Sequence, residues 1–104
     1  MQTENEYYEN LKKEKVLLRL YISGMTPAAQ KAFSNLEKLC EEHFPEKYHI
    51  EIVDLKEQPE RASKEQIFAV PTVVRELPPP IRKVIGDLSD SEKVLIGLQL
   101  SSFK

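Results

Sequence analysis

The spacing of apolar residues in the first half of the chain predicts a strand, a helix and a second strand. Branched and aromatic side chains crowd residues 15–23 and a glycine follows, the pattern of a strand that ends in a turn. Thr26 and Pro27 then open a helix, because threonine caps a backbone N–H and proline fits the first helical position. Apolar residues recur at three- and four-residue steps up to Pro45, and a second strand is predicted over 48–55. This β-α-β unit is expected to be parallel and right-handed.

The second half of the chain carries shorter and less regular elements. Residues 60–67 have a helical composition, and residues 68–74 are typical of the approach to a strand. The proline triplet at 78–80 cannot lie inside a helix or a central strand, so it predicts a rigid loop. A short apolar stretch over 81–85 follows and ends at a glycine.

Local signals conflict in the last apolar segment, residues 89–100. Ser89 and Glu92 have the spacing of a capping box, which favours a helix through Leu100. The same residues from Val94 onward are apolar, partly β-branched and interrupted by a glycine, which also suits a buried strand. Two interpretations stay open: an ordinary buried helix with a packing glycine, or a segment that adopts either form.

Composition places the chain among ordinary globular proteins. Its 104 residues and 12.0 kDa suit one domain, expected over 15–104, after a flexible N-terminal extension over 1–14. The formal net charge of −2 argues against a protein dedicated to the nucleic-acid phosphate backbone. The sequence has no secretory signal and no apolar run of about 18 residues, so we expect a cytoplasmic protein that does not enter the membrane.

The predicted strand, turn and helix form a thioredoxin-like layout, yet the residues for redox chemistry are missing. That chemistry requires two cysteines at the start of the helix, where one attacks and the other resolves. The turn over 23–27 contains none, and Cys40 lies on the apolar stripe of the helix, where a core position is expected. His43 and His49 have no cysteine or carboxylate at a metal-ligand spacing. We therefore expect no enzyme, no metal and no cofactor; a reactive Cys40 is the alternative.

Basic residues flank the proline triplet. Arg75 precedes it, and Arg82 and Lys83 follow it. One interpretation is scattered charge that keeps the protein in solution. The other is a docking face for an acidic partner, where charge complementarity sets orientation and association rate. On the second interpretation, these three residues are the candidate partner-binding residues.

Three segments of the chain resemble landmarks of the KaiB family of circadian clock proteins. The longest spans residues 77–98 and reads Leu-Pro-Pro-Pro-Ile-Arg-Lys-Val-Ile-Gly-Asp-Leu-Ser-Asp-Ser-Glu-Lys-Val-Leu-Ile-Gly-Leu. The turn over 20–27 and the segment over 70–73 are similar to two further landmarks. Together the resemblance extends over roughly residues 16–100.

The resemblance implies a non-enzymatic regulator that binds KaiC, an ATPase ring of the RecA type. The setting it implies is a circadian, timing or stress-response system, with a KaiA-like or signalling protein as a further partner. A thioredoxin-like redox or adaptor protein without a CxxC motif is the alternative.

Because this family is known for fold switching, the resemblance also implies an α/β fold with a thioredoxin-type β-α-β first half and a metamorphic second half. The resting form, a dimer or tetramer, has the order β-α-β-β-α-α-β, with residues 94–100 as a strand. The binding-competent monomer has the thioredoxin-like order β-α-β-α-β-β-α, with a cis bond before Pro71. The implied switch residues are Pro71, Pro78, Pro79, Pro80, Gly97 and Gln99.

Two expectations follow for the switch. The isolated protein is expected to rest in the first form, because the apolar tail suits a sheet that is buried on both faces. Gly97→Ala is expected to favour the second form, because glycine costs a helix about 1 kcal/mol relative to alanine.

Overall fold

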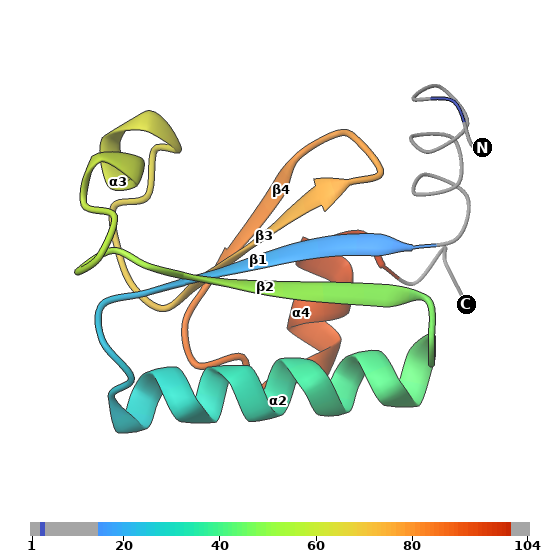
Figure 1. Ribbon diagram of the computed structural model, residues 1–104. Helices are drawn as coiled ribbons and strands as arrows, with labels where there is room; N and C mark the ends of the chain where they lie inside the picture. Colours follow the sequence, from blue (N-terminus) through green and yellow to red (C-terminus); the bar gives the residue numbers. More distant parts are fainter. Residues whose placement is uncertain (1–2, 4–14, 101–104) are drawn as a thin grey trace.

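The computed structural model describes Thr3 and residues 15–100, and its elements follow the thioredoxin-like order (Figure 1). The expected extension over 1–14 lies outside the described residues, apart from Thr3. None of the helices in the described part is long and apolar enough to cross a membrane. The elements are β1 (Val16–Ile22), α2 (Pro27–His43), β2 (Tyr48–Asp54), α3 (Glu60–Lys64), β3 (Thr72–Leu77), β4 (Arg82–Ile85) and α4 (Ser91–Gly97).

The four strands form one mixed sheet in the order β2-β1-β3-β4. β1 pairs with β2 in parallel, as the β-α-β pattern predicts, and with β3 in antiparallel fashion. β4 pairs with β3 as an antiparallel hairpin and forms one edge of the sheet. The proline triplet connects these two strands, so the rigid loop predicted there is the hairpin loop.

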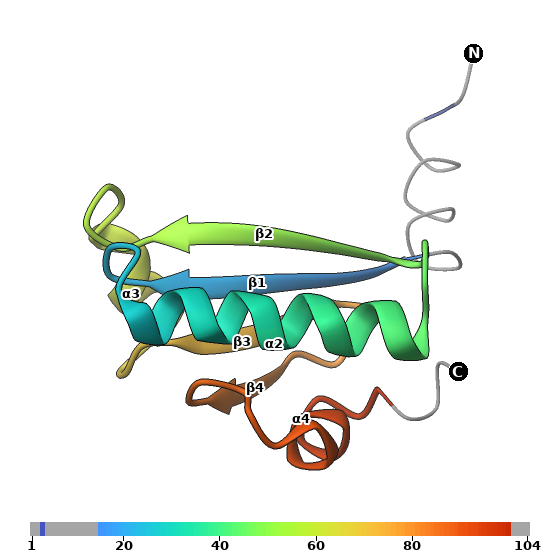
Figure 2. The same cartoon turned by 90° about the horizontal axis from the view of Figure 1, so that it is seen from below.

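The larger core lies on the face of the sheet that α2 and α4 cover (Figures 1 and 2). Helix α2 begins as predicted: Thr26 Oγ1 accepts a hydrogen bond from Ala29 N at 3.1 Å, and Pro27 is the first helical residue. Its apolar stripe packs on the sheet through Ala29, Ala32, Leu36, Leu39 and Cys40. A smaller cluster on the opposite face contains Tyr21, Val53, Ile67 and Val74.

The second half of the chain follows the sequence prediction at β3 and departs from it at two helices. Residues 68–71 form the predicted approach to a strand, and β3 begins at Thr72, directly after the Val70–Pro71 bond, which is cis as expected. Helix α3 is confined to Glu60–Lys64. Helix α4 is capped by Asp90, whose side chain accepts from Lys93 N at 3.1 Å, and not by Ser89.

The segment with conflicting signals is helical in this structure. Residues 94–100 do not form a strand here, because α4 runs to Gly97 and packs against β4. The described elements therefore follow the thioredoxin-like order, the second of the two orders that the resemblance implies. Within it, Val94, Leu98 and Leu100 are buried in the main core.

Candidate functional site

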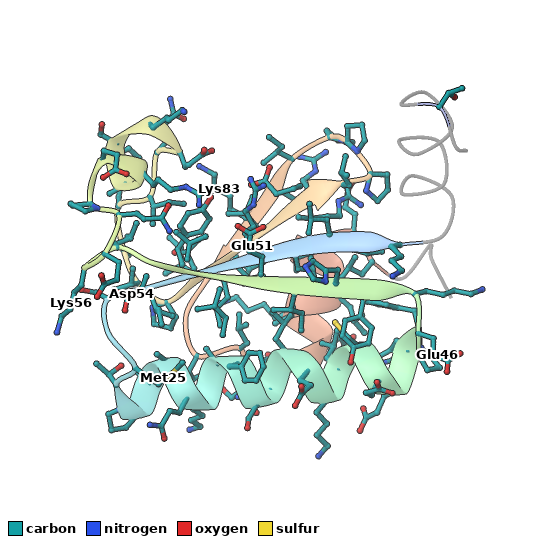
Figure 3. The ribbon with its side chains drawn as sticks, viewed as in Figure 1. Met25, Glu46, Glu51, Asp54, Lys56 and Lys83 are labelled. Atoms are coloured by element: carbon teal, nitrogen blue, oxygen red, sulfur yellow. The ribbon has the colours of Figure 1, made fainter. Side chains whose placement is uncertain are left out.

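The turn between β1 and α2 occupies the position where this layout places redox cysteines, and here it is a structural turn. Gly24 adopts a φ of +74° and donates its backbone N–H to Asp54 Oδ1 at 3.0 Å. The same oxygen accepts from Lys56 N at 2.9 Å. These two bonds, that of Gly24 first, lower the pKa of Asp54. Figure 3 shows Met25, Asp54 and Lys56 at this end of the sheet, and the turn over 23–27 contains no cysteine.

Cys40 lies in the middle of the core and is far from that turn. It is buried on α2, about 20 Å along the helix from its first residue. Burial, and then the charges of Glu41 and Glu37, raise the pKa of its thiol to about 12. Because the thiolate is the reactive species, this environment suppresses thiol chemistry.

We predict that Cys40 reacts slowly in the folded chain. A chromogenic disulfide reagent at mildly alkaline pH should label the native protein at least about 100-fold more slowly than the chain in urea. The native rate should keep rising toward the pKa of about 12, well above the range where an ordinary thiol ionises. A Cys40→Ala chain supplies the background. Rapid native labelling, or measurable reduction of insulin, would favour the redox alternative.

His43 and His49 do not meet at a common site. His43 ends α2 and is half-buried, whereas His49 lies exposed on β2. Within the described residues, no group of three or more histidine, cysteine, aspartate or glutamate side chains is arranged to hold a metal ion.

The three candidate basic residues have three different environments, so they do not form one exposed patch. Arg75 is only 2% exposed, and its Nη2 donates to Pro80 O at 2.8 Å while its Nη1 donates to Gln99 O at 3.3 Å. Burial, and then the positive charge of Arg82, lower the pKa of Arg75. Arg82 itself is exposed on β4 and forms no ion pair within the described part of the chain.

Lys83 is engaged by the end of α3. Its Nζ donates to Glu65 O at 2.7 Å and to Gln66 O at 3.1 Å. A cation at this position stabilises the carbonyl end of a helix. The ammonium group thus ties α3 to the hairpin through neutral carbonyl oxygens, and no carboxylate of the described chain lies within ion-pair distance of it.

Arg75 joins two groups of the implied switch residues. Its side chain lies on the core face of β3, two residues from buried Val73, and reaches both the proline loop and the segment after α4. We call Arg75, Pro80 and Gln99 the arginine bridge. The signal for it was present in the sequence, because strand alternation places residues 73 and 75 on one face. The sequence prediction placed Arg75 on the surface because its side chain is charged.

Gly97 and Gln99 shape the end of α4. A Cβ atom at position 97 would lie 2.6 Å from Val84 Cγ2, so glycine lets the helix approach β4 closely. Beyond it, Gln99 N–H bonds to Ile96 O and Leu100 N–H to Leu95 O, which is a Schellman motif. Gln99 has a φ of +54°, in the left-handed region that glycine adopts more readily than other residues.

The opposite face of the sheet carries a charged network that the sequence did not single out. Arg19 pairs with Glu51 at 3.3 Å and with Glu76 at 3.4 Å, and Arg61 lies 3.8 Å from Glu51. The Arg61 guanidinium also lies 5.8 Å from the ring centroid of Tyr21. The Tyr21 hydroxyl is buried and has no hydrogen-bond partner among the described residues. Arg19 is therefore a member of an ion-pair network on this face of the sheet.

Comparison with known sequences covers nearly the whole described chain. The KaiB domain family matches residues 19–100. The circadian clock oscillator protein KaiB of Microcystis aeruginosa is 46% identical over 88 residues, which cover 85% of this chain and 85% of that protein. The circadian clock protein KaiB3 of Synechocystis sp. is 44% identical over 86 residues, 83% of this chain and 84% of that protein.

Comparison with solved structures supports the thioredoxin-like fold. Mitochondrial thioredoxin 3 of Saccharomyces cerevisiae has a TM-score of 0.64 at 19% identity, covering 91% of this chain and 87% of that one. The N-terminal domain of SasA from Synechococcus elongatus has a TM-score of 0.65 at 14% identity, covering 86% and 79%. At these identities the likeness shows the fold alone.

Proposed function

Because the chain belongs to the KaiB family, we propose that it is a non-enzymatic regulatory protein that binds a KaiC-like ATPase ring of the RecA type. The observation that carries this proposal is the KaiB domain match over residues 19–100, which spans most of the described fold. The turn over 23–27 holds no cysteine and Cys40 is buried, which supports binding in preference to thiol catalysis. A KaiA-like or signalling partner, a role in timing or stress response and a cytoplasmic location belong to the same proposal.

Arg82, which is exposed on the hairpin and has no ion-pair partner within the described residues, is our candidate for direct contact with the ring. Arg82 projects from an edge strand, so a partner can reach it without displacing other described residues. Arg75 is buried directly opposite it on β3, Lys83 is the next residue of β4, and both contribute positive potential to the same edge. Charge of this kind mainly increases the association rate with an acidic surface and makes that rate depend on salt.

We expect the chain to co-elute with a KaiC homologue from the same genome during size exclusion in the presence of ATP. Arg82→Glu should slow association about tenfold at low salt and reduce its salt dependence. Lys38→Glu is the matched control, because Lys38 is exposed on α2 and its reversal changes the net charge equally. Failure of the wild-type chain to co-elute would contradict the proposed function. Equal association rates for the Arg82 and Lys38 variants would remove Arg82 from the contact.

We further propose that the thioredoxin-like form is the one that binds, and that it exchanges with a resting dimer or tetramer in which residues 94–100 form a strand. Oligomer contacts favour the resting form by mass action, so dilution should increase the thioredoxin-like population. Backbone chemical shifts of residues 94–100, followed over a concentration series, measure that population. Shifts that stay helical at every concentration, with a constant elution volume, would contradict the exchange.

A further inference from the structure

β4 presents an open edge to solvent. It is the last strand of the sheet, and Figure 2 shows it at the margin of the molecule beside α4. An edge strand offers unpaired backbone groups on which an extended segment of another protein can add a strand. Basic side chains on such an edge are also a known protection against unwanted pairing, so a binding role requires further evidence.

The hydrogen-bond pattern of the hairpin identifies which backbone groups face outward. Gly86 N–H bonds to Pro71 O at 2.9 Å, which fixes the pair 71/86 as a hydrogen-bonded one. Because such pairs alternate along an antiparallel ladder, Val84 and Arg82 bond to β3 in the observed register. The backbone N–H and C=O groups of Lys83 and Ile85 therefore point away from β3. These are the groups that an added strand would use.

The side chains on this edge favour a particular chemistry. Arg82 lies directly opposite Arg75 in the register, and like charges in that position repel. The next residue, Lys83, adds a second basic group without a carboxylate partner in the described chain. Acidic side chains on an incoming segment would offset this concentrated positive charge.

Apolar side chains lie beside the basic ones. Ile85 at the end of β4 is 62% exposed, and Ile96 on α4 is 65% exposed. Strand residues alternate between faces, so Arg82 and Val84 project toward the α4 side while Lys83 and Ile85 project to the other. An incoming strand thus meets a basic residue and an apolar residue on each face.

We propose that β4 receives an extended segment of the partner as a fifth strand, with consecutive acidic residues beside Arg82 and Lys83 and consecutive aliphatic residues beside Val84 and Ile85. This inference rests on the proposed function and names the chemistry of the segment that the ring contributes. A second copy of the chain is a poorer occupant, because pairing of two β4 strands places the Arg82 and Lys83 residues of both copies along one seam.

Amide hydrogen exchange tests the mode of binding directly. At concentrations where the chain is monomeric, the amides of Lys83 and Ile85 should exchange at least about tenfold more slowly in complex with the ring. The same protection is expected with a synthetic segment of about eight residues that contains Glu-Glu-Val-Ile, and not with its Lys-Lys-Val-Ile counterpart. Protection of these amides that appears without any partner as the chain concentration is raised would identify a second copy as the occupant and overturn the proposal.

Two substitutions of Ile85 distinguish the contribution of its backbone N–H to binding from that of its side chain. Ile85→Pro removes an outward N–H and takes no bond from the β3–β4 ladder, so it should weaken binding of the acidic segment about tenfold or more. Ile85→Thr keeps the N–H and should weaken binding by only about threefold. If Ile85→Pro does not fold, exchange at Lys83 in the wild-type chain decides the question.

The two proposals fail in different ways. A ring that binds while the Lys83 and Ile85 amides exchange as in the free chain overturns strand addition and leaves the proposed function standing. A ring that does not bind contradicts the proposed function. In that case the synthetic segments test strand addition. If the Glu-Glu and Lys-Lys segments protect the Lys83 and Ile85 amides equally, strand addition by an acidic segment is overturned.

Discussion

Replacing Gly97 with alanine is expected to destabilise the thioredoxin-like form by about 1–2 kcal/mol. The added Cβ would lie 2.6 Å from Val84 Cγ2, and the restricted χ1 of valine limits its ability to move away from this contact. Overpacking of this severity costs toward the upper end of about 1–3 kcal/mol, whereas the gain in helix propensity is about 1 kcal/mol. The sign is therefore opposite to the sequence prediction that alanine favours this form.

A double-mutant cycle isolates the contact between α4 and β4. Val84→Ala makes room for the new methyl group, so the two substitutions should show a coupling of about 1 kcal/mol or more in urea unfolding. Val84→Ala alone provides the reference for the lost side chain. Strict additivity of the two substitutions would show that Gly97 tolerates a side chain, and the close approach would then not explain the glycine.

Arg75→Met is expected to lower the free energy of unfolding of this form by about 3 kcal/mol. The side chain is 2% exposed, and its removal deprives the carbonyl groups of Pro80 and Gln99 of their charged donor. The methionine fills part of the space, so the lost hydrogen bonds dominate. The unfolding midpoint in urea measures the change.

Arg82→Met is the matched control for the arginine bridge. It removes the same charge from the residue directly opposite, yet Arg82 is exposed, and its loss relieves repulsion of Arg75. We expect this control to change stability by no more than about 0.5 kcal/mol in either direction. Equal effects of the two substitutions would show that charge alone matters and that the bridge to Pro80 and Gln99 does not.

The fold of the first half could be predicted because its signals are local and strong. Strand β1, the Thr26 cap of α2 and strand β2 all follow from spacing and turn chemistry within a few residues. In the second half the deciding interactions are not local. Asp90 caps α4 in place of Ser89, one residue from the predicted cap, and α4 is selected over a strand by packing on β4 and the core.

The candidate site was predicted less well, because the type of a residue does not show how deeply its side chain is buried or what it contacts. Arg75 and Lys83 carry the same charge as Arg82, but their side chains donate to backbone carbonyl groups of segments distant in sequence, Gln99 and Glu65. Gly97 illustrates the same point, since its helix penalty is visible in the sequence while its contact with Val84 depends on the tertiary fold. Cys40 was predicted correctly as a core residue because helical periodicity alone places it.

The central place of β1 has a consequence for the growing polypeptide. β1 is the first described strand to leave the ribosome, yet it pairs on one side with β2 and on the other with β3, whose paired residues follow about 50 to 60 positions later. At elongation rates of about 5–20 residues per second, one edge of this apolar strand waits for seconds without its partner. One edge of β1 therefore stays open to wrong strand pairing and to chaperone capture until β3 has been synthesised, even after β2 has paired.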